Sequence, residues 1–207
     1  MSELFDSLVQ RFGADAVKQL SEPQDDKLGL ITIQLPLRND ITVLLTDGLS
    51  SYLMPVLPKH KGQEHIELYF CLPAYWDLSD AENPRMNWVI NWLYRLSKHV
   101  VEKQTWFGLG HTIPTGNPIV PLSETMKQSY FFMNRPILLK EHLYPIELAD
   151  KTVNFLALTP IFEDEFDYKI GKGTEKMQKK LAHHGVDELL DDYRSTVLKS
   201  KWRFSGK

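Results

Sequence analysis

The residue best suited to do chemistry is His111, in a segment rich in glycine and proline, Gly108-Leu109-Gly110-His111-Thr112-Ile113-Pro114. A histidine in such a loop could act as a general base or bind a metal. Alternatively, its ring nitrogens could bond buried backbone groups and hold the loop in shape. The segment has neither the Walker pattern nor the dinucleotide-binding glycine pattern. We therefore predict a structural histidine.

Acidic residues gather at positions 163 to 167. Glu163, Asp164, Glu165 and Asp167 follow a predicted strand. Such carboxylates could take part in acid–base catalysis or bind a metal, but their spacing is not that of a calcium loop. We predict a solvated turn in which one acid caps backbone N–H groups.

The alternative hypothesis is an enzyme. In that case His111 would work with an acid, either Glu67 or Glu163, in a loop-lined cleft. A cleft open to solvent, with the histidine and a carboxylate at hydrogen-bond distance, would favour this hypothesis.

The remaining reactive side chains give weaker patterns. Cys71 is the single cysteine, and it shares a predicted strand face with Glu67 and Tyr69. Nothing local supplies the base that would activate its thiol, although His111 could be close in space. His183 and His184 are adjacent, and on a helix they would point about 100° apart, which prevents them from sharing a metal. No Gly-x-Ser-x-Gly elbow is present. We expect no catalytic residue, no metal and no cofactor.

Large aromatic side chains in predicted loops are candidates for partner binding. Aromatic residues often carry much of the energy of a protein interface, although they also cover the edges of cores. The candidates are Tyr52, Trp76, Trp106 and Phe107. The short basic segment Lys199-Ser200-Lys201-Trp202-Arg203 makes nucleic-acid binding a weaker alternative.

Length and composition define the class of protein. The chain has 207 residues, of which 43% are hydrophobic, and a formal net charge of −3. These values exclude disordered, collagen-like, coiled-coil and disulfide-rich proteins, and they give no overall attraction to nucleic acid or anionic lipid. No apolar stretch reaches the roughly 18 residues of a membrane helix, and the acidic start, Met1 to Asp6, does not resemble a signal peptide. We expect a cytoplasmic protein that does not bind membranes.

Hydrophobic periodicity predicts the elements in the N-terminal half. It indicates a helix over residues 3–20, interrupted or kinked at Gly13, and then three strands. The strands fall near residues 31–35, 41–45 and 65–72, and a polar segment at 38–40 suggests a hairpin between the first two.

A long helix is predicted to begin with Asn83 as N-cap and Pro84 at its first position. Its apolar stripe should lie across the sheet; the stripe is formed by Met86, Val89, Ile90, Leu93, Leu96 and Val100.

The C-terminal half is predicted to contain a long loop at 105–123 and strands near 127–133 and 152–159. The last strand is apolar on both faces and should be central. A helical C-terminal extension over 174–198 follows, with one helix from Thr174 to His184 and another around 189–197. These patterns favour a single α+β domain over residues 1–207, with a mixed, mostly antiparallel sheet packed by one long central helix.

Several segments, in their order along the chain, resemble the Suppressor of fused (SUFU) domain family, over roughly residues 40–182. They are Thr46–Ser50, Glu67–Pro73, the tryptophan-rich helix 84–102, Gly110–Pro114, Phe155–Pro160 with the acids at 163–165, and Gly171–Leu181. Seven positions match the family's motifs and are assigned structural roles on that basis: Gly48, Glu67, Gly110, His111, Thr112, Pro160 and Glu163.

The resemblance implies a mixed α/β domain that binds protein partners and has no catalytic residues to transfer. In animal members a second domain joins the first, and together they hold a transcription-factor peptide as an added strand. This sequence ends before a second domain could fit, and its size resembles bacterial single-domain members, which have been proposed as immunity proteins against toxin domains. We predict a non-catalytic module that binds another polypeptide, with toxin immunity as the specific form of this hypothesis.

Overall fold

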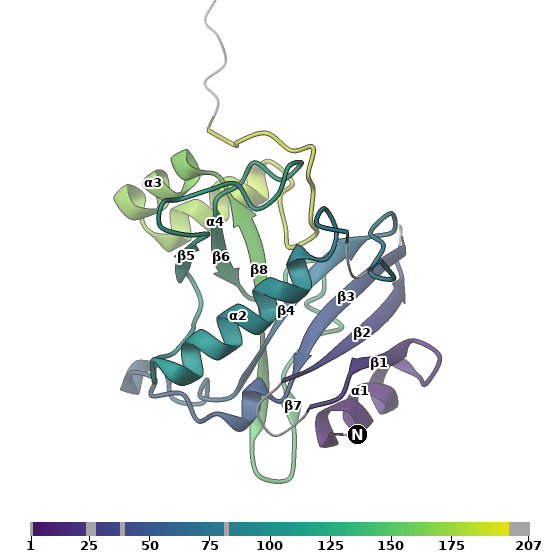
Figure 1. The fold of residues 1–207 in the computed structure, drawn as a ribbon. Helices are drawn as coiled ribbons and strands as arrows, with labels where there is room; N and C mark the ends of the chain where they lie inside the picture. Colours follow the sequence, from purple (N-terminus) through teal and green to yellow (C-terminus); the bar gives the residue numbers. More distant parts are fainter. Residues whose placement is uncertain (1, 24–27, 38–39, 81–82, 199–207) are drawn as a thin grey trace, which may run out of the picture.

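A computed structural model of the chain describes residues 2–23, 28–37, 40–80 and 83–198 (Figure 1). Its helices and strands follow in this order: α1 (Glu3–Phe12), β1 (Val17–Ser21), β2 (Gly29–Pro36), β3 (Asp40–Asp47), the 3-10 helices η1 (Leu49–Ser51) and η2 (Pro58–His60), β4 (Ile66–Pro73), α2 (Trp88–Glu102), β5 (Thr112–Pro114), β6 (Tyr130–Asn134), β7 (Ile146–Glu147), β8 (Thr152–Ile161), α3 (Glu163–Lys172) and α4 (Thr174–His183).

The described strands form one mixed sheet in the order β1-β2-β3-β4-β8-β6-β5, and β7 pairs with β8 outside this path. Neighbours run antiparallel except at the centre, where β4 and β8 are parallel and Leu68 lies opposite Leu156. A parallel pair requires a long crossover connection, and here the crossover contains α2, β5, β6 and β7. The predicted α+β fold with a mostly antiparallel sheet is confirmed, and β8 has the central position that its two apolar faces indicated.

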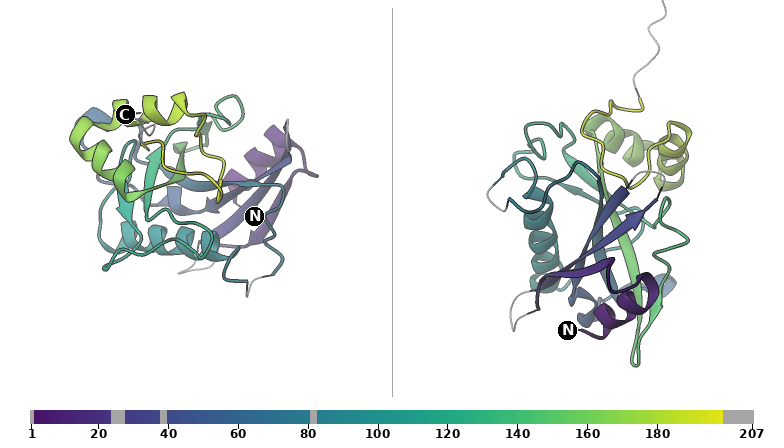
Figure 2. Two further views of the ribbon diagram at one scale, coloured as in Figure 1. Left: turned by 90° about the horizontal axis from the view of Figure 1, so that it is seen from above. Right: turned by 90° about the vertical axis from the view of Figure 1, so that its right-hand side faces the viewer.

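Helices cover both faces of this sheet (Figure 2). Alternation along β4 points Leu68 and Phe70 into the core beneath α2, whereas Tyr69 and Cys71 point into the opposite core beside α1. On that opposite face, α4 packs against the end of the sheet formed by β6 and β8. The central strands are therefore buried on both faces.

The long helix α2 crosses the sheet as predicted, and Val89, Leu93, Leu96 and Val100 are buried beneath it. Full burial of an aliphatic side chain contributes about 1.5–3 kcal/mol, so this stripe is a major source of stability. The helix begins at Trp88, one turn later than predicted, because residues 84–87 form a separate turn first.

Two predicted helices are wrong in part. The helix expected over 3–20 ends at Phe12, because Gly13 adopts a φ of +91°, and residues 17–21 instead form the edge strand β1 on β2. The C-terminal extension is helical only over α4, and Gly185 follows it as predicted. Beyond it, residues 186–198 run as a non-helical segment that is held by the contacts described below.

Some predictions fall outside the described residues. Residues 38 and 39 of the hairpin and the basic segment Lys199–Arg203 are among them. The register Pro36 opposite Asp40 agrees with a hairpin between β2 and β3. None of the described helices has the length and apolar character needed to cross a membrane.

Candidate functional site

Glu67 and the segment that follows β3 form a closed hydrogen-bonded unit. The fully buried Glu67 carboxylate accepts hydrogen bonds from the Thr46 hydroxyl and from the backbone N–H groups of Gly48 and Ser50, the latter two at 3.1 and 2.9 Å. Burial raises the pKa of Glu67 to about 7, although each of these hydrogen bonds lowers it. The carboxylate thus fixes the turn that leads into loop 51–62, consistent with the structural roles predicted for Gly48 and Glu67.

Gly110 lies where the loop after α2 meets the start of α4. Its φ is +83°, and a Cβ at this position would come within 2.5 Å of the Thr174 hydroxyl oxygen, so both conformation and space require glycine. Its N–H donates to the Met133 carbonyl, and the Met133 N–H donates to the His111 carbonyl, both at 2.8 Å. These bonds align the loop so that Thr112 begins β5 beside β6.

The His111 ring is half-buried and stands edge-on to the Trp106 indole, with ring centroids 4.3 Å apart. The same indole contacts the His60 ring at 4.9 Å. Burial lowers the pKa of His111, and the charges of Lys169 and His60 lower it further. The predicted hydrogen bonds from the ring to the backbone are not found among the described residues, because the ring is turned toward Trp106. In this loop the backbone of His111 makes the fixing bonds.

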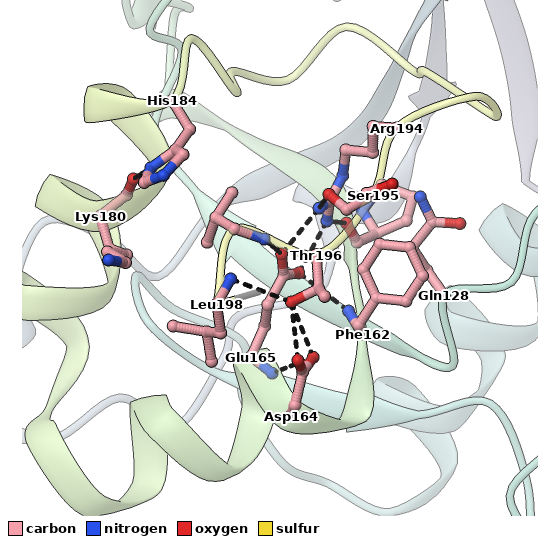
Figure 3. Close-up of polar contacts among 12 residues, drawn as sticks. Gln128, Phe162, Asp164, Glu165, Lys180, His184, Arg194, Ser195, Thr196 and Leu198 are labelled. Atoms are coloured by element: carbon pink, nitrogen blue, oxygen red, sulfur yellow. Dashed lines mark hydrogen bonds and ion pairs between the residues drawn. The ribbon is translucent and has the colours of Figure 1, made fainter. Parts of the chain in front are cut away.

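The acids at 163–165 open helix α3 and do not form the predicted solvated turn (Figure 3). Glu165 supplies the predicted cap, since its carboxylate accepts from the Phe162 N–H at 2.9 Å. The same fully buried carboxylate forms a two-point ion pair with Arg194, at 2.7 and 2.8 Å. Such planar pairing is strong, and removing either partner would leave a buried charge.

Further contacts bind the C-terminal segment to the same region. Arg194 donates to the Pro160 carbonyl at 2.6 Å, and the Thr196 hydroxyl donates to Asp164. The Val197 N–H donates to Glu165 at 2.9 Å. These contacts explain why residues 186–198 do not form a helix despite their helical spacing.

Glu188 is a third buried glutamate with a positioning role, and the sequence analysis missed it. Its carboxylate accepts from the backbone N–H groups of Ile137, Leu138 and Leu139 at 3.0 Å each, and from the Tyr69 hydroxyl at 3.3 Å. It therefore ties the C-terminal segment to the loop after β6. Two acids followed by two leucines, at positions 187 to 190, are too common a pattern to reveal such a contact.

Cys71 and the paired histidines make no reactive site. Cys71 is buried, and burial, reinforced by the charges of Glu188 and Asp187, raises the pKa of its thiol. His184 bonds the Lys180 carbonyl at the end of α4 at 2.9 Å. Among the described residues, no group of three His, Cys, Asp or Glu side chains is placed to hold a metal.

Two of the four predicted partner-binding aromatics belong to the core. Trp76 is buried and donates to the Met86 carbonyl at 3.0 Å, and Phe107 is buried over Met54. Their assignment as exposed anchors is wrong because other side chains already cover their rings. Tyr52 and Trp106 are half-buried at the edge of the core, so part of each ring faces solvent.

The structure does not bring His111 together with either predicted acid. Glu67 is enclosed by its three donors, while Glu163 lies at the start of α3 and lines a hollow together with Lys127 and Arg194. Neither that hollow nor a second one, which is lined by residues 61–63 and 107–109, includes His111 in its lining. The pair that acid–base catalysis would need is therefore not formed in the described part of the chain.

Two loops form an accessible surface beside the C-terminal end of α2. Loop 51–62 carries Leu53 and Leu57, which are 65% and 49% exposed, and loop 105–111 carries Trp106. The two loops are joined where Met54 meets Phe107 and where His60 meets Trp106. We name this the two-loop surface. It combines exposed aliphatic groups with a fixed backbone, as a docking surface requires.

Two hollows on the described surface bear on the site. The larger, about 720 Å³, lies between loop 119–121 and residues 192–196. The smaller, about 440 Å³, lies at the edge of the two-loop surface, which supplies residues 61–62 and 107–109 of its lining, and it is closed on another side by the loop after β6.

Comparison with known proteins gives a clear family match. The family described as Suppressor of fused protein (SUFU) matches residues 24–195. No curated protein sequence gives a significant match.

Solved structures with the same fold include bacterial and animal proteins. A SUFU homologue from Neisseria gonorrhoeae superposes with a TM-score of 0.67 at 20% identity, covering 95% of this chain and 96% of that one. The structure of a Sufu–Fu complex gives 0.68 at 17% identity, covering 94% and 90%. Drosophila Suppressor of Fused gives 0.67 at 18% identity, and the match covers 94% of this chain but 50% of that one.

Proposed function

Because the chain belongs to the Suppressor of fused family, we propose that it is a non-catalytic module that binds another polypeptide through the two-loop surface. The observation that carries the proposal is that Leu53 and Leu57 are exposed on a loop whose backbone is held in place by hydrogen bonds and packing. Glu67 closes the turn at the start of the first loop, and Gly110 is locked against α4 at the end of the second. A rigid surface loses little conformational entropy on binding.

The structural comparison supports a protein ligand. One of the similar structures is a complex of Sufu with Fu. An interface of standard size would bury about 1,200–2,000 Å² in total. The half-buried rings of Tyr52 and Trp106 lie at the edge of the core, where anchors of such interfaces commonly lie.

The specific form of the proposal is toxin immunity, in which the partner is a toxin domain that this chain neutralises by covering it. This form is suggested by the likeness to a SUFU homologue from a bacterium, Neisseria gonorrhoeae. We place the activity in the cytoplasm, which the single, buried cysteine favours.

The decisive experiment is affinity capture from the native cell with three forms of the protein. They are the wild type, Trp106→Ala and the control Tyr193→Ala, whose ring is 85% exposed but lies outside the two-loop surface. Folding of each form is checked by circular dichroism and thermal unfolding. We expect a polypeptide retained at a stoichiometric level by the wild type and the control, and at least about tenfold weaker retention by Trp106→Ala.

The outcomes separate the parts of the proposal. If no polypeptide is retained but a metal or small molecule co-purifies, the binding function is wrong. Equal retention by all three forms would leave the function standing and refute the two-loop surface as its site. For toxin immunity, co-expression with the captured partner should restore the growth of cells that the partner alone stops.

A further inference from the structure

The groove at the edge of the two-loop surface, about 440 Å³ in volume, lies where the parallel strands β4 and β8 begin. Its floor is the apolar edge of the core, formed by Ile66, Phe155 and Leu156. Leu109 and Tyr144 supply its sides, and the Tyr144 side chain is 52% exposed. The groove can therefore receive an apolar side chain from outside.

The walls of the groove are fixed before any ligand arrives. Arg11 of α1 stacks on the Tyr144 ring, 3.8 Å from its centroid, and donates to the carbonyls of Tyr144 and Pro145 at 2.7 and 3.3 Å. On another side, the Asn154 amide donates to the Gly62 carbonyl at 3.0 Å. Fixed walls favour binding because little has to be ordered.

The charged residues that line the groove are all basic, in a chain with a net charge of −3. They are Lys61, Arg135 and Lys140. Two acids lie near the rim. Glu141 contacts Lys140 at 3.6 Å in an exposed pair, which contributes little, and Glu64 is engaged by the Gly62 N–H at 2.7 Å. A positive rim around an apolar floor is complementary to an acidic ligand with an apolar anchor.

We infer that this groove receives an acidic segment of the partner polypeptide. One aliphatic or aromatic side chain lies against Tyr144 and Leu109, and its neighbouring carboxylates lie beside Arg135 and Lys140. The inference rests on the proposed function and defines the chemistry of the partner. Nucleic acid fits less well, because its affinity comes from a longer track of phosphate contacts than these three cations offer.

The test begins with selection of random short peptides displayed on phage against the wild-type protein. We expect enrichment of Asp and Glu around a single Leu, Phe or Tyr. An enriched peptide carrying a fluorophore is then titrated by anisotropy against the wild type, Arg135→Glu/Lys140→Glu and Tyr144→Ala. The matched control is Lys172→Glu/Lys176→Glu, which makes the same change in net charge at exposed positions of α3 and α4.

The expected results are at least about tenfold weaker binding to Arg135→Glu/Lys140→Glu and to Tyr144→Ala, a control that binds like the wild type, and affinity that falls with rising salt. The inference is overturned if the enriched peptides are neutral or basic, or if nothing is enriched. It is also overturned if the reversal variant binds as tightly as the wild type, or if a single-stranded oligonucleotide binds the groove better than the peptide does.

Failure of this inference can be told apart from failure of the proposed function. The partner captured from the native cell is titrated against the same charge-reversal variant. If the partner binds the wild type and the variant equally, the module function stands and only the groove is excluded. If the wild type captures no partner, the proposed function itself fails.

Discussion

Glu67 allows a sharp test of how a buried carboxylate supports the two-loop surface. Glu67→Ala removes the acceptor for the N–H groups of Gly48 and Ser50. A buried donor left unpaired costs about 1–3 kcal/mol, so two of them should lower the free energy of unfolding by about 4 kcal/mol.

Glu67→Gln should behave differently because it keeps the shape of the side chain. Both backbone N–H groups bond the same oxygen, Oε1, which the amide retains. The new NH₂ group faces the Thr46 hydroxyl, which can accept from it and turn its own hydrogen to the Leu68 carbonyl, 3.3 Å away. The exchange of bonds should change the stability by about 1 kcal/mol or less at acidic pH.

The pH dependence of the difference between wild type and Glu67→Gln then reports ionisation of Glu67. Because the folded state raises the pKa of Glu67 from its usual 4.5 to about 7, the native state binds more protons than the unfolded state between these values. The protonated carboxyl therefore contributes its full stability below pH 4.5, and this contribution is lost as the pH rises through about 7. The difference between the folded and unfolded pKa values corresponds to about 3 kcal/mol. Above pH 7, the free energy of unfolding of Glu67→Gln should therefore rise relative to that of the wild type by up to this amount.

The assay is equilibrium unfolding in urea, followed by tryptophan fluorescence at several pH values, with both proteins measured together so that other titrating groups cancel. The reasoning is refuted if the difference between wild type and Glu67→Gln is the same at pH 5 and pH 8. It is also refuted if Glu67→Ala is as stable as Glu67→Gln, because the N–H groups would then need no acceptor.

Three further predictions concern other fixed points of the fold. Arg194→Ala should lower the free energy of unfolding by about 3–5 kcal/mol, since it leaves Glu165 buried and unpaired. Arg194→Met/Glu165→Met should recover only part of this loss in the same urea assay, because it removes the buried charge but leaves the Phe162 and Val197 N–H groups without their acceptor. Gly110→Ala should lower the free energy of unfolding by about 1–3 kcal/mol, because of the positive φ and the clash with Thr174. The control Gly171→Ala, whose new Cβ would meet nothing within 4 Å, should be neutral or slightly stabilising. Equal melting temperatures of the two variants would contradict this. Burial lowers the pKa of His111 below its usual 6.5, so as the pH falls the unfolded state is protonated before the folded state. The stability that is present above pH 6.5 should therefore be lost as the pH falls below this value. His111→Gln should lack this loss, and thermal unfolding of both forms between pH 5 and pH 8 decides the point.

The elements that the sequence predicted well are those with a strong, uninterrupted period. Helix α2 has a continuous stripe, and β4 and β8 have apolar residues on the faces that the structure buries. Helix α3 escaped prediction because it opens with three acids and has little apolar stripe of its own. The spacing of Leu189, Leu190, Tyr193 and Val197 was helical, but Tyr193 is 85% exposed and tertiary contacts decide the path of this segment.

The positions of the candidate site could be predicted only in part. The motif positions Gly48 and Glu67 were identified, but the bond between them closes a loop across β3, the turn and β4, which residue types do not reveal. Likewise, Trp76 and Trp106 look alike in sequence, and only the packed core shows that the first is covered and the second is half open. Arg194 and Glu188 find their partners through contacts 29 and 51 positions away, respectively, for which the sequence carries no local pattern.

The parallel pairing of β4 with β8 has a consequence for the order in which the protein folds. Strands β1 to β4 are neighbours in both sequence and space, so this antiparallel unit can form early during synthesis. The strand that pairs with the other edge of β4 is β8, and it is synthesised 88 residues later, as the register of Ile66 with Asn154 shows. Until then this edge of β4 has no neighbouring strand. A nascent chain stalled between these strands would therefore expose the future centre of its own sheet, and slow translation there should increase its dependence on chaperones.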